Sequence, residues 1–117
     1  MKFDDLLTVP YLDNGRTMSG LDCYGLVIEC FRREGKELAD LTLPKQRSVA
    51  DHVGTLNVRE VSEPEKGIGV QFLLGGRLHI GYMISKRDVL HMTESGVRIT
   101  PIMSIQHGNP KYFEVIG

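Results

Sequence analysis

The sequence predicts an α+β domain in which one helix near the N-terminus packs on an antiparallel β-sheet. Residues 22–33 carry apolar side chains at helical spacing, and short apolar runs separated by glycine-containing turns follow residue 67. The chain has 117 residues, of which 41% are hydrophobic and 25% charged, a composition typical of a globular protein. We therefore expect a single domain over residues 1–117.

The expected helix runs from Asp22 to Arg33. Asp22 or Ser19 can cap its first turn, and Gly35 is suited to end it. The apolar residues follow the i, i+3, i+4, i+7, i+8 spacing and are Cys23, Leu26, Val27, Cys30 and Phe31. This face of the helix is the one we expect to be buried against the sheet.

The second half of the chain predicts an antiparallel meander. Gly75 and Gly76 form a hairpin turn signal between the first two strands. The expected strands are Ile68–Leu74, Leu78–Ile84, Val89–Met92, Val97–Thr100 and Tyr112–Ile116. Between the helix and these strands, Leu43 to Lys66 is the longest loop-like stretch, with room for a short helix or strand near Val49 to Val61.

The charge balance and the apolar runs exclude several classes of partner. With 14 Lys and Arg against 15 Asp and Glu, the net charge is −1, which gives no broad attraction to nucleic acid or anionic lipid. No apolar stretch approaches the roughly 18 residues that span a bilayer. Met1 to Pro10 carries Asp4 and Asp5 and lacks the apolar run of a signal peptide. We therefore expect a chain made in the cytoplasm, without membrane insertion.

Two cysteines lie on the expected helix. Cys23 and Cys30 are seven residues apart, or about 10.5 Å along a helix, which is too far for a disulfide. Cys23 lies at the helix start, where free backbone amides and the helix dipole favour a thiolate. Cys23 is therefore the candidate nucleophile, while Cys30 is expected in the core.

A nucleophilic cysteine needs a base and a group that orients the base. His79 and His91 fall inside expected strands, which hold a side chain rigidly, whereas His52 and His107 fall in loop-like stretches. Two alternatives stay open from the residues alone. Cys23 can be a small buried hydrophobe beside structural histidines, or it can join His79 and His91 as three ligands of a zinc ion.

Three segments together resemble the NlpC-type cell-wall cysteine peptidases of the papain-like superfamily. Pro10–Tyr11, Gly15 and the run Gly20–Val27 resemble the family's nucleophile motif, which typically reads Asp-Cys-Ser-Gly-Leu-Val after a Pro-Tyr pair. His79–Tyr82 resembles the strand that supplies the base, and Val89–His91 resembles the next strand, which supplies the third polar residue. The steps from the tyrosine to the cysteine and from the first to the second histidine are both twelve residues. The resemblance covers most of the chain, to about Met92.

This resemblance implies a papain-like α+β core and a cysteine peptidase. The reaction would be amide hydrolysis in the stem peptide of peptidoglycan, often between D-glutamate and diaminopimelate. Cys23 would attack the carbonyl, His79 would act as base and then acid, and His91 would orient His79. The Tyr11 hydroxyl and the Cys23 backbone N–H would stabilise the oxyanion. No metal or organic cofactor is implied.

The form Asp-Cys-Tyr-Gly-Leu-Val on a short chain most resembles the phage-tail branch of the family. Such proteins are encoded in phage or prophage tail modules and serve tail assembly and local wall cleavage, and a virion would carry the enzyme to the wall. Asp22 and Tyr24 lie next to the nucleophile and are expected to contact substrate. However, Tyr24 replaces the usual serine, which leaves open a catalytically silent tail-tip protein, or another cysteine amidase or acyltransferase.

The hairpin that carries the two histidines sets a geometric condition on the triad. If Ser85 to Asp88 is a four-residue loop, Tyr82 faces His91, and His79 then points to the opposite face of the sheet. A triad needs both imidazoles on one face. The loop must therefore hold an odd number of residues, or a bulge must intervene.

Overall fold

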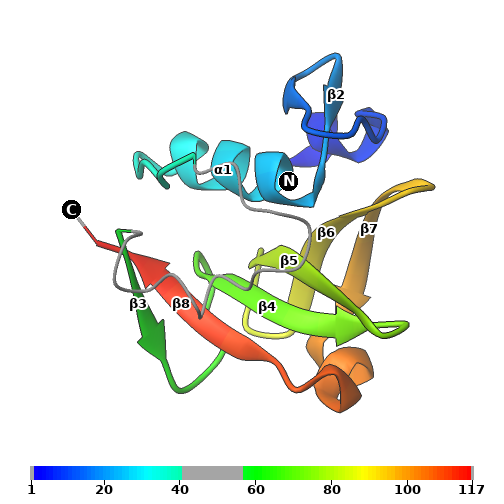
Figure 1. Ribbon diagram of the computed structural model, residues 1–117. Coiled ribbons are helices and arrows are strands. Elements are labelled where there is room, and N and C mark those ends of the chain that lie inside the picture. The colour runs from blue at the N-terminus through cyan, green and yellow to red at the C-terminus, as the bar shows by residue number, and fades with distance from the viewer. Residues whose placement is uncertain (1, 41–56, 117) are drawn as a thin grey trace.

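The computed structural model describes residues 2–40 and 57–116 (Figure 1). Its α-helix is α1 (Cys23–Arg33), and two 3₁₀-helices are η1 (Asp4–Thr8) and η3 (Ile102–Gly108). The strands are β1 (Arg16–Thr17), β2 (Gly20–Leu21), β3 (Val58–Val61), β4 (Gly69–Leu74), β5 (Arg77–Met83), β6 (Asp88–Thr93), β7 (Gly96–Pro101) and β8 (Lys111–Val115). No helix in these two ranges is long and apolar enough to cross a membrane.

The main sheet has six antiparallel strands in the order β3-β8-β4-β5-β6-β7. Strands β4 to β7 form the expected meander, and the turn between β4 and β5 is the Gly75–Gly76 pair, with φ of 58° and 78°. Positive φ at both positions is the backbone that glycine adopts without strain. The predicted α+β class, a cysteine-bearing helix on an antiparallel sheet, is confirmed (Figure 1).

Helix α1 forms where the sequence predicted it. Asp22 is its N-cap, because the Asp22 carboxylate accepts a hydrogen bond of 2.7 Å from the backbone N–H of Gly25. The helix therefore begins one residue later, at Cys23. At the other end Gly35 has φ of 78°, the left-handed backbone that commonly ends a helix.

The sheet is covered on both faces. Helix α1 covers one face, where Phe31 packs edge-on against Tyr82 with ring centroids 5.0 Å apart. The 3₁₀-helix η3 contributes to the apolar cluster on the other face. Because side chains alternate along a strand, neighbouring residues belong to different clusters. Ile80, Tyr82, Leu90 and Met92 face the helix, while Val70, Phe72, Met83 and Val89 face the opposite cluster.

Several elements were not predicted from the sequence. The 3₁₀-helices η1 and η3 and the two-residue strands β1 and β2 lack a periodic signal. Val58–Val61 is a strand at the edge of the sheet, inside the stretch for which a helix or strand was expected. The rest of that expectation falls on residues 41–56, outside the described residues. Strand β8 does not continue the meander but returns beside β4.

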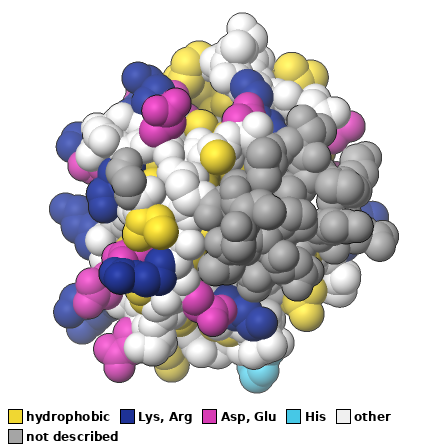
Figure 2. All heavy atoms as spheres, turned by 60° about the vertical axis from the view of Figure 1, so that its left-hand side comes forward, with side chains coloured by type: hydrophobic (Ala, Val, Ile, Leu, Met, Phe, Trp, Pro, Cys, Tyr) yellow, Lys and Arg dark blue, Asp and Glu magenta, His cyan; other side chains and the backbone are white. Residues whose placement is uncertain are grey.

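The surface carries charges of both signs. On the face shown in Figure 2, basic and acidic side chains lie next to one another rather than in separate areas. Ion pairs of the surface include Lys2–Glu34 and Arg33–Asp5. The visible part of this face therefore presents no extended surface of one sign.

Candidate active site

Cys23 is the first residue of α1 and is half-buried. The backbone of Ile80 on β5 is hydrogen-bonded to its sulfur, as are the backbone groups of Cys23 and Tyr24 at the helix start. Since the nitrogen of Ile80 follows directly on His79, the sulfur lies beside the backbone of the expected base. Two elements far apart in the sequence, the start of α1 and the middle of β5, meet at this point.

A gap in the sheet makes room for the sulfur. The pairing of β5 with β6 ends at Gly81↔His91, although β5 itself extends to Arg77 and β6 to Thr93. At the other end of this ladder, just after β5, the backbone N–H of Ile84 donates to the backbone carbonyl of Asp88. Since N–H groups alternate in direction along a strand, those of Tyr82 and Ile80 also point toward β6. By this alternation the N–H of Ile80 points into the unpaired region, where it meets the Cys23 sulfur.

His79 and His91 lie on the same face of the sheet. In the observed register Met83 pairs with Val89 and Gly81 pairs with His91, so His79 and His91 share one face. The loop is therefore not Ser85 to Asp88, because Asp88 lies opposite Ile84, and both imidazoles do lie on one face. That face is the one of Phe72, Met83 and Val89, opposite to the face that α1 covers. Gly81 is required here, because a Cβ at this position would come within 2.5 Å of the Val89 side chain.

Phe72 holds both imidazoles. This residue of β4 pairs directly with His79 of β5 and stacks on that ring, with centroids 5.8 Å apart. It also meets the His91 ring edge-on, with centroids 5.5 Å apart. Sequence reasoning missed this residue. The signal was present, because a two-residue turn at Gly75–Gly76 sets the pairing of Phe72 with His79.

His91 is buried and hydrogen-bonded to the next strand. Its Nε2 lies 2.8 Å from the Thr100 hydroxyl on β7, a contact that the sequence gave no signal for. The Nδ1 atoms of His79 and His91 are buried and have no hydrogen-bond partner among the described residues. Within that part of the chain no hydrogen bond joins the two imidazoles, nor His79 to Cys23. Buried polar atoms without a partner are uncommon in native proteins, and here two of them belong to the candidate base and its candidate orienting residue.

Tyr11 lies at the rim of the site. Its side chain is 39% exposed, and its hydroxyl donates a long hydrogen bond of 3.5 Å to Asp13. A backbone bridge to Leu21 fixes it just before the helix start. Partial burial raises the pKa of Tyr11, and the negative charges of nearby groups, including a Cys23 thiolate, raise it further. Tyr11 is thus within electrostatic reach of the sulfur, as an oxyanion donor must be.

Asp22 and Tyr24 are held by the protein itself. The Asp22 carboxylate caps α1 and accepts a 2.7 Å hydrogen bond from Arg16, which also pairs with Asp40. The Tyr24 ring is 7% exposed, lies under the Arg16 guanidinium and donates its hydroxyl hydrogen bond to the Ala39 carbonyl. Both side chains stabilise the segments around the nucleophile, and their contact with substrate stays a prediction.

An ion pair that the sequence did not suggest flanks the site. Arg77, the first residue of β5, and Glu94, on the turn that follows β6, are paired at 3.4 Å. The charge of Glu94 acts on both Tyr11 and His79, and the charge of Arg77 acts on His79. The two charged groups therefore lie close enough to the expected base to act on its pKa.

The comparison with protein families now decides the family. The NlpC/P60 family model matches residues 8–115, which includes all the site residues described above. The chain belongs to the NlpC/P60 family. No curated protein matches the chain. Membership confirms the resemblance drawn from the three motifs, and it places the protein among cell-wall cysteine peptidases and amidases.

The surroundings of this NlpC/P60 site favour the uncharged forms of the cysteine and of both histidines. Burial, and then the Asp22 carboxylate, raise the pKa of the Cys23 thiol, although three backbone groups act against them. The sequence-based expectation of a lowered pKa is therefore wrong in its net direction, because burial outweighs the helix start. Burial also lowers the pKa of His79, and that of His91 to about 4. At neutral pH the site holds a thiol beside uncharged imidazoles.

The zinc alternative finds no support in the arrangement of side chains. It requires Cys23, His79 and His91 to converge on one point as ligands. Among the described residues, no group of three or more His, Cys, Asp and Glu side chains is placed to hold a metal ion.

The two thiols are expected to differ in reactivity. Cys30 is completely buried, and burial raises its pKa to about 12, whereas Cys23 is half-buried with backbone hydrogen bonds that favour its thiolate. Brief treatment with iodoacetamide near neutral pH should therefore modify Cys23 first. Peptide mass spectrometry reads out the modified site, and preferential labelling of Cys30 would contradict this assignment.

The buried His91 also predicts a pH dependence of stability. Its pKa is about 4 in the folded protein against 6.5 for an unperturbed histidine, so the unfolded chain binds more protons between these values. Above pH 6.5 this group does not reduce the free energy of unfolding. As the pH falls from 6.5 toward 4, the free energy of unfolding decreases by about 3 kcal/mol because of His91. Urea unfolding at pH 7.5, 6.0 and 4.5 measures this loss.

The control is His91→Gln, which keeps a polar group and cannot titrate. Carboxylates also titrate in this range, so the comparison is between the slopes of the two proteins. We expect a flatter dependence in the variant, and equal slopes would rule out His91 as the source.

Proposed function

We propose that the protein is a cysteine peptidase that hydrolyses an amide bond in peptidoglycan stem peptides, of the type between D-glutamate and diaminopimelate. The observation that carries the proposal is the Cys23 sulfur on the backbone of Ile80, the residue after His79, at the gap between β5 and β6 of an NlpC/P60 domain. Cell-wall peptide hydrolysis is the chemistry of this family, and the particular bond is our inference.

The proposed mechanism starts from a neutral pair. The imidazole of His79 takes the thiol proton of Cys23 as the sulfur attacks the carbonyl carbon, so a C–S bond forms and the carbonyl oxygen becomes an oxyanion. The backbone N–H of Cys23 and the Tyr11 hydroxyl stabilise that oxyanion. The proton then passes from His79 to the leaving amine as the C–N bond breaks. Water, deprotonated by His79, cleaves the thioester and restores the thiol.

The positions of the other groups support this sequence of steps. His91 is fixed by Thr100 and lies on the same sheet face as His79, and Phe72 contacts both rings. In the proposal His91 orients His79 and stabilises its protonated form. A neutral imidazole is the form that accepts a proton, and burial maintains that form near pH 7.

For its biological setting, we propose a component of a phage or prophage tail that acts in tail assembly or local wall penetration. The support is the sequence form Asp-Cys-Tyr-Gly-Leu-Val around the candidate nucleophile. In this proposal the chain is made in the cytoplasm and a virion carries it to the wall, with other tail proteins as partners.

The test is digestion of purified stem peptides. The protein is incubated with a tetrapeptide containing D-glutamate and diaminopimelate, and the products are identified by mass spectrometry. We expect two fragments separated at that bond. Cleavage elsewhere in the peptide would change the substrate assignment, and an intact peptide together with no reaction of Cys23 toward an activity-based thiol probe would contradict a peptidase.

A second candidate is a tail-tip protein that keeps the fold without catalysis. It is favoured by Tyr24, which stands where the family typically has serine and whose hydroxyl is used inside the protein. The thiol probe separates the two, because a silent scaffold gives no covalent adduct at Cys23 beyond that of a free thiol. An acyl-enzyme trapped with a non-peptide amide would instead favour the amidase or acyltransferase reading.

A further inference from the structure

Arg16, on β1, joins three segments around the start of α1. One terminal nitrogen of its guanidinium donates to the Asp22 carboxylate at 2.7 Å and to the Gly15 carbonyl at 2.8 Å. Its Nε lies 3.1 Å from both carboxylate oxygens of Asp40, which follows the helix. The chain before the helix, the N-cap and the chain after the helix are thus tied to one side chain. The reaction proposed above gives Arg16 no role.

The first turn of α1 leaves room for this arginine. A Cβ at Gly25 would collide with the Gly15 carbonyl oxygen and would lie 3.2 Å from the Arg16 guanidinium. The guanidinium also lies over the Tyr24 ring, 5.6 Å from its centroid. The side chains of Arg16 and Asp22 are 27% and 17% exposed, so their ion pair is less screened by water and salt than a pair on the open surface.

The carboxylate that Arg16 binds lies next to the candidate nucleophile. Asp22 directly precedes Cys23, and its negative charge raises the pKa of the thiol, because a thiolate would be a second negative charge nearby. Arg16 is therefore the cation bonded to the carboxylate beside the sulfur. Other titratable or charged groups around the sulfur and the neighbouring Tyr11 hydroxyl come from the segment before β1, from β5 and from the turn after β6, and they are Tyr11, Asp13, Arg77, His79 and Glu94.

From these contacts we propose that Arg16 is a positioning residue for the nucleophile, which holds the Asp22 carboxylate on the first turn of α1 and offsets its charge beside the Cys23 sulfur. The fixed carboxylate caps the helix through the N–H of Gly25 and so keeps the first turn in place. Backbone groups of that turn, those of Cys23 and Tyr24, are hydrogen-bonded to the sulfur. The inference rests on the proposed function, because it gives Arg16 a part in forming the nucleophile.

The experiment measures the rate of Cys23 alkylation by iodoacetamide against pH, with peptide mass spectrometry as the readout. Arg16→Gln leaves the Asp22 charge without this partner, and the midpoint of the rate profile should rise by about 0.5 pH unit or more. Asp22→Asn keeps a side-chain oxygen that caps a helix and should lower the midpoint. The double variant removes both charges and should return toward the wild type.

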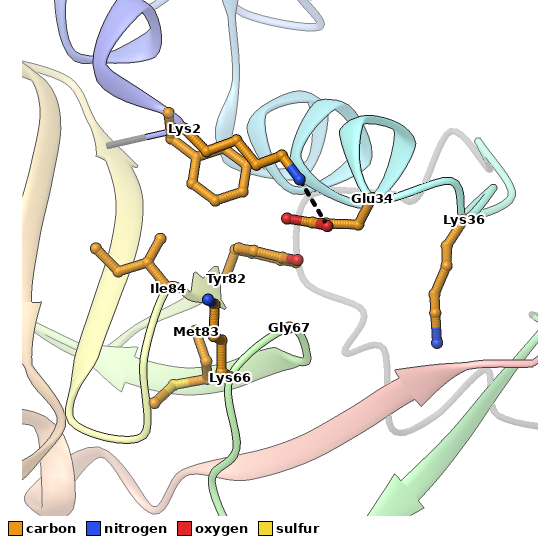
Figure 3. A pocket seen from close by; sticks show the side chains of 9 residues that line it. Lys2, Glu34, Lys36, Lys66, Gly67, Tyr82, Met83 and Ile84 are labelled. Atoms are coloured by element: carbon orange, nitrogen blue, oxygen red, sulfur yellow. Dashed lines mark hydrogen bonds and ion pairs between the residues drawn. The ribbon is translucent and has the colours of Figure 1, made fainter.

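Lys2→Gln is the matched loss of one charge at the opposite end of α1. Lys2 is paired with Glu34 at 3.1 Å beside a cavity of about 570 Å³, and Figure 3 shows this pair from close by. The variant leaves a carboxylate without this partner, as Arg16→Gln does, but about 16 Å of helix separates it from Cys23. Its midpoint should equal that of the wild type.

Three outcomes would overturn the proposal: an unchanged midpoint in Arg16→Gln, an equal rise in Lys2→Gln, or a double variant that keeps the full rise. The last would show that a disturbed helix start, and not charge, is the cause. If circular dichroism shows that Arg16→Gln does not fold, the double variant is compared with Asp22→Asn. We then expect the higher midpoint in the double variant, and equal midpoints would overturn the proposal. Because alkylation needs no turnover, a protein that cleaves no stem peptide leaves this result intact.

Discussion

Replacing Cys23 by alanine is expected to abolish covalent turnover of stem peptides. The sulfur forms the bond to the carbonyl carbon in the proposed mechanism, and it is hydrogen-bonded to the backbone of Ile80 beside the candidate base. His79→Ala should be nearly as damaging, because the pKa of the Cys23 thiol is raised and the thiol needs a base. The double variant should be no worse than either single one, since nucleophile and base act as a unit. Product formation from the tetrapeptide measures all three.

Cys30→Ala is the matched control for this series. It removes the other thiol, which is fully buried in the cluster between α1 and the sheet. We expect a modest loss of stability and retained activity, because Cys30 does not reach the site. Full activity in Cys23→Ala would end the cysteine-peptidase proposal. Inactivation of the wild type by a chelator would instead support a zinc site formed by Cys23, His79 and His91.

Much of the fold follows from local pattern. The apolar spacing from Cys23 to Phe31 places α1, and alternating strands with the Gly75–Gly76 turn place β4 and β5. The local pattern does not show which strands distant in the sequence pair with each other. Strand β8 pairs with β4 rather than with β7, because η3 carries the chain across the sheet between them. A seven-residue 3₁₀-helix has no periodic signal strong enough to reveal that return.

The members of the candidate site stay a prediction from the sequence, and their geometry could not be read from it. The spacing of Cys23, His79 and His91 suggested a triad, whereas the face on which each histidine lies depends on one loop. The hydroxyl oxygen of Ser85 accepts hydrogen bonds from the backbone N–H groups of Arg87 and Asp88, so β6 begins at Asp88. Asp88 then lies opposite Ile84, with three residues between these two, and this register brings both imidazoles to one face.

The chemistry of the thiol was the least predictable feature. A cysteine at a helix start suggests a lowered pKa, yet the net direction depends on how deeply the sulfur is buried, which the sequence does not state. The same holds for His91, whose environment combines burial, His79 and Arg98. Thr100 and Phe72 act on the histidines from neighbouring strands, so their roles emerge only from register.

The role of His91 gives the last prediction. If it orients His79, His91→Ala should lower kcat by roughly 10²- to 10⁴-fold, a smaller loss than in Cys23→Ala. His91→Asn and His91→Gln should keep part of the rate, because an amide can still hold the His79 imidazole in one tautomer. The substrate KM should change little, since His91 is buried and does not meet the peptide.

Thr100→Val separates orientation from mere packing. It keeps the shape of the side chain and removes the hydroxyl that lies 2.8 Å from the His91 Nε2. If His91 acts through its fixed position, this variant should lower kcat by a smaller factor than His91→Ala and shift the acidic limb of the pH–rate profile, which reports the pKa of His79. A structural role alone would lower the unfolding midpoint and leave that limb in place. An unchanged kcat in His91→Ala would show that His79 is positioned without it, with Phe72 as the remaining contact that holds the ring.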